Sequence, residues 1–90
     1  MTAERWQTFS KSQQLLALGA EFERARVWEK ESREGFVGAL ERALVLIDLS
    51  LDDPKWKGDT LQLFALRNEV AKFYSGENKD GDVSQLYRVL

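Results

Sequence analysis

Cysteine and histidine are both missing from this 90-residue sequence. Without cysteine there is no disulfide, no thiolate metal ligand and no thiol nucleophile. Without histidine the chain lacks the side chain that most often acts as a general base near neutral pH, and the two absences together remove the usual zinc ligands. Zinc enzymes and hydrolases with a Ser-His or Cys-His nucleophile are therefore excluded. We expect a non-catalytic protein with no metal and no cofactor.

An excess of charge of either sign is missing as well. Thirteen basic and fifteen acidic residues alternate along the chain and leave a net charge of −2. This balance creates no broad positive field for a phosphate backbone or an anionic lipid surface, so we do not expect nucleic acid as a partner. The first residues also lack the apolar core of a signal peptide, and a cysteine-free chain suits a reducing compartment, so we expect a cytoplasmic protein.

The most apolar part of the chain is the stretch 36–51, in which eleven of sixteen residues are apolar. It is shorter than the ~20 apolar residues that span a membrane, and it carries charged residues, so no membrane partner is expected. Its apolar residues cover most of a helix circumference, which predicts a central helix buried on more than one side. Ser32 is the expected N-cap, and Pro54 ends this helix or begins a single further turn.

Residues 2–30 are predicted to form one long helix with two apolar faces. At ~100° per residue, one group of apolar side chains faces the core and a second group lies nearly opposite. A helix of this length would measure ~42 Å, which exceeds the width of a compact domain of this size. Either a kink near Gly19 folds the helix back, or a partner chain covers the second face, and we favour the partner. The predicted partner-binding residues are Trp6, Phe9, Leu16, Ala20 and Val27.

Two further helices are expected towards the C-terminus. Asp59 and Gln62 have the spacing of a capping box, and Gly76 suits the left-handed end of the helix that follows. Asp82 begins a similar pattern for a short last helix. With no alternating strand pattern and no internal repeat, the sequence predicts an all-α fold. We expect a small helical bundle of three main helices plus a short C-terminal helix, in a single domain over residues 1–90.

Two short patterns resemble ligand sites. The segment 78–83 has acids spaced as in the middle of an EF-hand loop, but the first and last ligand positions would be Gly76 and Tyr87, so we interpret it as a turn. The segment 55–57 places an aromatic ring between two lysines, as in some nucleic-acid or lipid contacts. Two lysines make a weak patch, and we interpret Trp56 as a lid over the end of the bundle.

Asp48 is the polar residue of most interest, because it lies on the most apolar helix. In one interpretation Asp48 and Glu41 mark a narrow solvated edge of that helix. In the other, Asp48 is buried and needs a cation such as Arg67 or Arg24, since an unpaired buried carboxylate is costly. Asp48, Arg67 and Asn68 together form the possible polar site.

Three segments resemble the helical-bundle substrate-binding proteins that accompany small nucleotidyltransferases, relatives of the HEPN group. These are Glu4-Arg5-Trp6, the segment Arg33-Glu34-Gly35-Phe36, and Arg67-Asn68 followed by Tyr74. The resemblance implies a helical bundle that presents substrate to a catalytic partner through Arg67 and Asn68. The histidine that follows Arg-Asn in the nucleases of that group has no counterpart here, so RNA cleavage is not implied.

The leading hypothesis is therefore a non-catalytic helical-bundle protein that acts through protein–protein interaction, most simply as a homodimer. The alternative is an accessory substrate-binding subunit of a nucleotidyltransferase-like partner.

Overall fold

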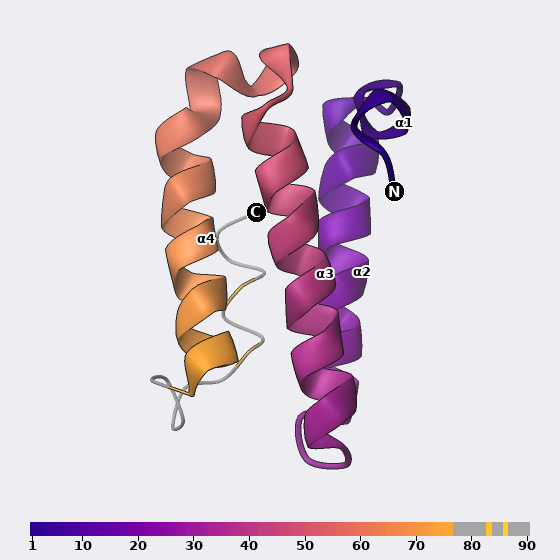
Figure 1. Cartoon of the computed structure of the whole chain (residues 1–90), viewed down its shortest axis with the longest axis vertical. Coiled ribbons are helices and arrows are strands. Elements are labelled where there is room, and N and C mark those ends of the chain that lie inside the picture. Colours follow the sequence, from indigo (N-terminus) through magenta and orange to yellow (C-terminus); the bar gives the residue numbers. More distant parts are fainter. Residues whose placement is uncertain (77–82, 84–85, 87–90) are drawn as a thin grey trace.

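The computed structural model describes residues 1–76 together with Val83 and Leu86. Over these residues it is an all-α bundle without strands, made of α1 (Ala3–Gln7), α2 (Lys11–Trp28), α3 (Arg33–Leu51), a 3-10 helix η1 (Pro54–Asp59) and α4 (Thr60–Ser75). The helix α3 lies at the centre and packs against α2 on one side and α4 on the other (Figure 1). The predicted all-α class with three main helices is confirmed.

The long helix predicted over residues 2–30 is wrong, because the chain breaks at residues 8–10 into α1 and α2. Ser10 caps α2: its hydroxyl accepts from the backbone N–H of Gln13, and the Gln13 side chain accepts from the backbone N–H of Ser10. This capping box begins a new helix. The remaining 18 residues of α2 measure about 27 Å, which fits a molecule whose longest dimension is 35 Å. The length of the helix therefore demands neither a kink at Gly19 nor a partner.

The central helix is confirmed. The hydroxyl of Ser32 accepts from the backbone N–H of Gly35, and α3 runs from there to Leu51. Its buried side chains spread over a wide arc, as expected for a helix between two neighbours. They are Phe36, Ala39, Leu40, Ala43, Leu46, Ile47 and Ser50.

The connection from α3 to α4 differs from the prediction at Asp59. Pro54 begins η1, as expected from the prediction that it starts a single further turn. Asp53 caps η1 by accepting from the backbone N–H of Lys55. Asp59 makes no side-chain capping bond to α4, because its carboxylate is ion-paired with Lys11 of α2. The predicted capping box at Asp59 is therefore wrong, since a long-range ion pair replaces the local bond.

Gly76 ends α4 in the left-handed conformation, with φ at 84°. A side chain at such a φ meets the following carbonyl group, so Gly76→Ala is expected to lower the free energy of unfolding by about 1 kcal/mol. Gly58→Ala is the control, because a Cβ there would meet nothing within 4 Å. Urea unfolding of the two variants checks this, and equal effects would contradict it.

Val83 and Leu86 are buried in the same core as the main helices. The other residues of the predicted C-terminal helix, and most of the segment 78–83, lie outside the described residues. No helix in the described part of the chain is long and apolar enough to cross a membrane.

Candidate functional site

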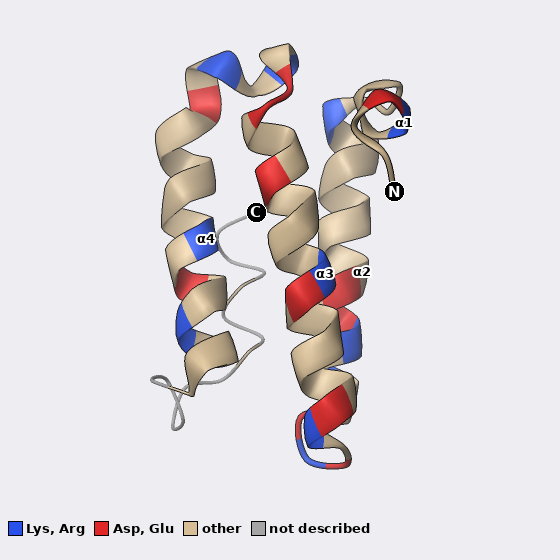
Figure 2. Cartoon of the chain, viewed as in Figure 1, with Lys and Arg blue, Asp and Glu red and all other residues tan. Residues whose placement is uncertain are grey.

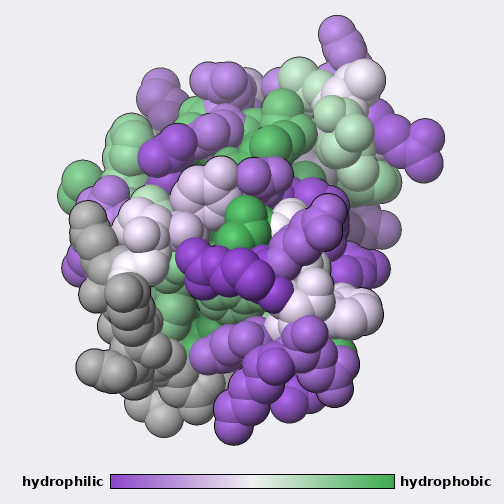
Figure 3. Space-filling model, turned by 60° about the horizontal axis from the view of Figure 1, so that its bottom comes forward, coloured by the Kyte–Doolittle hydropathy of each residue, from purple (hydrophilic) through white to green (hydrophobic). Residues whose placement is uncertain are grey.

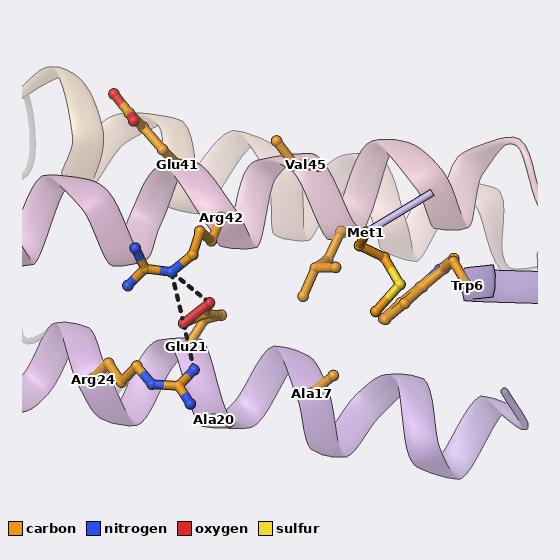
Figure 4. Close-up of a pocket in the computed structure, with 10 residues that line it drawn as sticks. Met1, Trp6, Ala17, Ala20, Glu21, Arg24, Glu41, Arg42 and Val45 are labelled. Atoms are coloured by element: carbon orange, nitrogen blue, oxygen red, sulfur yellow. Dashed lines mark hydrogen bonds and ion pairs between the residues drawn. The ribbon is translucent and has the colours of Figure 1, made fainter. Parts of the chain in front are cut away.

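A cavity of about 520 Å³ opens between α2 and α3. Apolar side chains of both helices and of the N-terminal residues form most of its lining, and a group of charged side chains lies at the end remote from Trp6 (Figure 4). We call it the α2–α3 groove. The residues that line it are Met1, Trp6, Ala17, Ala20, Glu21, Arg24, Glu41, Arg42, Val45 and Leu46.

Glu21 is a buried carboxylate at the charged end of the groove. Arg42 of α3 donates from Nε to both of its oxygens, at 3.2 and 2.8 Å, and Arg24, one helical turn further along α2, donates from Nη1 at 2.6 Å. A buried carboxylate is costly unless it is paired and hydrogen-bonded, and two guanidinium groups meet that requirement. The three side chains also join α2 to α3.

The two arginines keep donors that Glu21 does not use. Among the described residues, the terminal nitrogens of Arg42, and Nε and Nη2 of Arg24, have no hydrogen-bond partner. More than half of each arginine side chain is exposed. Glu41 does not neutralise them, because its carboxylate points away from the groove in Figure 4 and accepts from the Tyr74 hydroxyl at 2.8 Å. That hydrogen bond raises the pKa of Tyr74.

The predicted partner-binding residues divide into two groups. Leu16, with 74 % of its surface exposed, Ala20 and Val27 lie on the outer side of α2. Trp6 is completely buried, and Phe9 is half-buried with its ring edge-on to the Trp6 ring. The assignment of Trp6 to an exposed face is therefore wrong, because the break at residues 8–10 turns α1 back onto the bundle.

The possible polar site is only partly assembled. Arg67 donates from Nε to Asp48 at 2.7 Å, and both side chains are substantially exposed. Asp48 is therefore on a solvated edge and is also paired, so each of the two interpretations was right in part. Arg24, the other suggested cation, pairs with Glu21 instead. Asn68 is exposed, and neither Arg67 nor Asn68 lines the α2–α3 groove.

Gln14 is the centre of a buried hydrogen-bond network at the α1 end of the bundle. Its amide nitrogen donates to the Trp6 carbonyl and to Asp53, both at 2.9 Å, and its oxygen accepts from the indole N–H of Trp56. The Trp6 indole donates to the Ser50 hydroxyl at 3.0 Å. Trp56 is buried with the Lys11 ammonium over its ring, as expected for a lid over this end of the bundle. The neighbouring Lys55 is not solvated as such a lid would have it, because its ammonium pairs with the buried Asp53. This network is structural, because all of its groups bond to one another.

Burial raises the pKa of the Asp53 carboxyl, but hydrogen bonds from Lys55 and Gln14 lower it by more than burial raises it. The net pKa is therefore below the ordinary value of 3.8. A depressed pKa means that the carboxylate stabilises the fold above the unfolded-state pKa, and that this contribution is lost as the pH falls through the folded-state value. The stability lost in Asp53→Asn should therefore be largest near neutral pH and shrink below 3.8. Urea unfolding at several pH values measures it, and a difference that does not change with pH would contradict the assignment.

Two features were missed from the sequence. Glu21 lies in a charged segment of α2, and its burial depends on Arg42, twenty-one residues later. Leu61 and Phe64 form an exposed apolar pair on α4, separate from the exposed apolar residues of α2, and Leu61 is 84 % exposed. The spacing of Leu61 and Phe64 by three residues on the helix was the available signal.

Charge is mixed over the rest of the surface. Basic and acidic residues lie close together along α2, α3 and α4 (Figure 2). The end with the α2–α3 turn is largely hydrophilic (Figure 3), because residues 29–31, 33 and 34 are charged and exposed. Within the described residues, no group of three or more acidic side chains is placed to hold a metal ion.

Comparison with protein-family models, curated proteins and solved structures gave no match to this chain.

Proposed function

We propose that this protein is a non-catalytic helical bundle that acts through protein–protein interaction, as a homodimer formed by the outer side of α2. The observation that carries the proposal is the exposure of Leu16, Ala20 and Val27 on that side. The three residues share one side of the helix, because they are separated by four and seven positions. A reducing compartment such as the cytoplasm suits a chain without cysteine.

A surface of this kind fits a two-fold symmetric contact. In such a dimer the same patch meets itself, so one stripe supplies both halves of the interface. Ala20 lies between Leu16 and Val27 in the stripe, and a small side chain near the axis lets two helices approach closely. The apolar side chains on either side would then leave water, which is worth roughly 25 cal/mol per Å² of buried apolar surface.

The α2 stripe is narrow for a stable dimer. Specific interfaces bury about 800 Å² on each partner, which is more than one side of a helix of this length supplies. Val45 of α3 and Met1 are also exposed, and both line the α2–α3 groove, as Ala20 does. We therefore place the edge of the interface along the α2 rim of the groove.

The test is the molecular mass in solution by sedimentation equilibrium. The unmodified chain should have the mass of a dimer at about 100 µM, and Leu16→Glu should reduce it to that of a monomer, because a buried unpaired carboxylate is costly. Leu61→Glu is the matched control, since Leu61 is even more exposed but lies on α4. A monomeric unmodified chain would contradict the proposal, and so would dissociation by Leu61→Glu but not by Leu16→Glu.

A second proposal is the accessory substrate-binding role, which has the exposure of Asn68 and the partial exposure of Arg67 in its favour. It ranks lower because Arg67 already pairs with Asp48. A nucleoside triphosphate, the substrate of a nucleotidyltransferase, is a direct probe. Amide NMR shifts confined to Arg67 and Asn68 and lost in Asn68→Ala would support this role, and their absence would remove it.

A further inference from the structure

We propose that the homodimer is parallel, and that Leu16 of each copy inserts into the α2–α3 groove of the other. In a parallel dimer the two-fold axis runs along α2, so the two α2 helices point in the same direction. This inference rests on the proposed homodimer and extends its interface across the α2 rim into the groove. The occupant of the groove is then a second copy of this chain.

The two flanks of α2 beside Ala20 differ in size and charge. At ~100° per residue, Leu16 and Glu23 lie about 40–60° to one side of Ala20. Ala17 and Arg24 lie about 40–60° to the other side, and both line the groove. One flank therefore carries a large apolar side chain and an acid, whereas the other carries a small apolar side chain and a base at the same spacing along the helix.

The direction of the two-fold axis decides which flanks meet. An axis along α2 sets each flank against the opposite flank of the partner, at the same height on the helix. Leu16 of the partner subunit then faces the gap between Ala17 and Ala20, at the groove. An axis across α2 would set each flank against itself, so Leu16 would stay outside the groove.

The groove has room for a leucine side chain. Its volume is about 520 Å³, and Figure 4 shows the small Ala17 side chain directed towards Met1 and Trp6. Val45 of α3 also lines the groove and is 53 % exposed. Leu16 is itself 74 % exposed, so its insertion removes apolar surface of both copies from water. This burial adds area to the α2 stripe, which by itself is narrow for a stable dimer.

The charges of the two flanks complement each other in the same arrangement. An axis along α2 brings Glu23 of the partner subunit beside Arg24, whose Nε and Nη2 have no hydrogen-bond partner among the described residues. The Glu23 carboxylate accepts from Arg26 within its own helix, and a carboxylate has room for further donors. Two-fold symmetry forms the contact twice. Complementary charges of this kind fix the orientation of two partners.

Disulfide trapping between two different variants distinguishes the two axis directions. Leu16→Cys is mixed with Ala17→Cys in one sample and with Glu23→Cys in another, and mass spectrometry measures the covalent heterodimer formed on oxidation. The parallel dimer should trap the Ala17→Cys mixture at least about 10-fold faster, because only there do the two Cα atoms come within about 7 Å. In the other mixture the two cysteines share one flank and lie about 10 Å apart along the helix.

The second mixture is also the control. An axis across α2 near Ala20 would bring Leu16→Cys beside Glu23→Cys of the partner and keep it away from Ala17→Cys. Failure to trap the Ala17→Cys mixture, or equal or faster trapping of the Glu23→Cys mixture, would therefore overturn the parallel arrangement. Each mixed dimer keeps one native Leu16, so one inserted leucine remains.

A charge reversal tests the contact with Arg24. Glu23→Arg should raise the dissociation constant of the dimer about 10-fold, because two attractive contacts become repulsive. Glu69→Arg is the matched control, since Glu69 pairs with Lys72 three residues later on α4 and should not affect the dimer. The Glu23–Arg26 pair has the same spacing. Equal dissociation constants of the two variants would overturn the contact.

Sedimentation equilibrium of the unmodified chain separates this inference from the homodimer itself. A dimeric chain that fails the trapping test would keep the homodimer and remove the parallel arrangement. A monomeric unmodified chain would remove both.

Discussion

Gln14→Leu is expected to lower the free energy of unfolding by about 3 kcal/mol. The leucine would fill most of the space but would leave the Trp56 indole N–H and the Trp6 carbonyl buried without their partners. Each unsatisfied buried group costs about 1–3 kcal/mol, and the Asp53 carboxylate would lose a donor as well. Urea unfolding followed by far-ultraviolet circular dichroism measures the effect.

The control for this prediction is Gln62→Leu, which makes the same change at an exposed position on α4. Substitutions of that kind stay within about 0.5 kcal/mol. If Gln14→Leu behaved like Gln62→Leu, the network at the α1 end of the bundle would not contribute to stability as described.

Trp6→Ala is expected to cost about 3–5 kcal/mol, the range for removing a fully buried large aromatic side chain. Trp6 is the only buried residue of α1, so the variant should also release α1 from α3. Trp6→Phe keeps most of the apolar volume but loses the hydrogen bond to Ser50. It should therefore lower the free energy of unfolding by about 1 kcal/mol relative to the unmodified chain. Unfolding by urea ranks the variants.

Trp6→Ala also shows whether Trp6 is a core residue or an interface residue. A buried Trp6 predicts lost stability at every protein concentration, whereas an interface residue would show its effect as a change of mass at nearly constant monomer stability. Leu16→Ala should behave in the opposite way, with an effect on folding of less than about 0.5 kcal/mol. A stable Trp6→Ala monomer would contradict the position of Trp6.

The parts of the fold that could be predicted from the sequence rest on strong local signals. Three such signals affect only the backbone a few residues away: the cap at Ser32, the proline after α3 and the left-handed glycine at the end of α4. The width of the apolar arc on α3 likewise indicated that it lies between two neighbours.

The break between α1 and α2 was missed although Ser10 and Gln13 have capping-box spacing. Apolar residues continue across it at helical intervals, so periodicity favoured one helix. Without the break, Trp6 falls on the same face as Leu16 and looks exposed. Its burial depends on α1 folding back onto α3, which no local pattern shows.

The charged residues were the least predictable. Glu21, Asp59 and Asp53 each find partners on another element or through a buried network, and their neighbours in sequence do not identify those partners. The ion pair between Asp48 and Arg67 could be suggested from the sequence, because Asp48 lacks a base nearby on its own helix.

Disulfide trapping is the most direct test of whether two copies meet through the outer side of α2, because the chain has no cysteine of its own. Ala20→Cys should form a covalent dimer quickly on oxidation, since a bridge needs Cα atoms within about 7 Å and Ala20 lies near the proposed axis. Asn68→Cys, exposed on α4, is the reference. A dimer formed by the outer side of α2 predicts rapid trapping of Ala20→Cys alone, and equal or faster trapping of Asn68→Cys would contradict it.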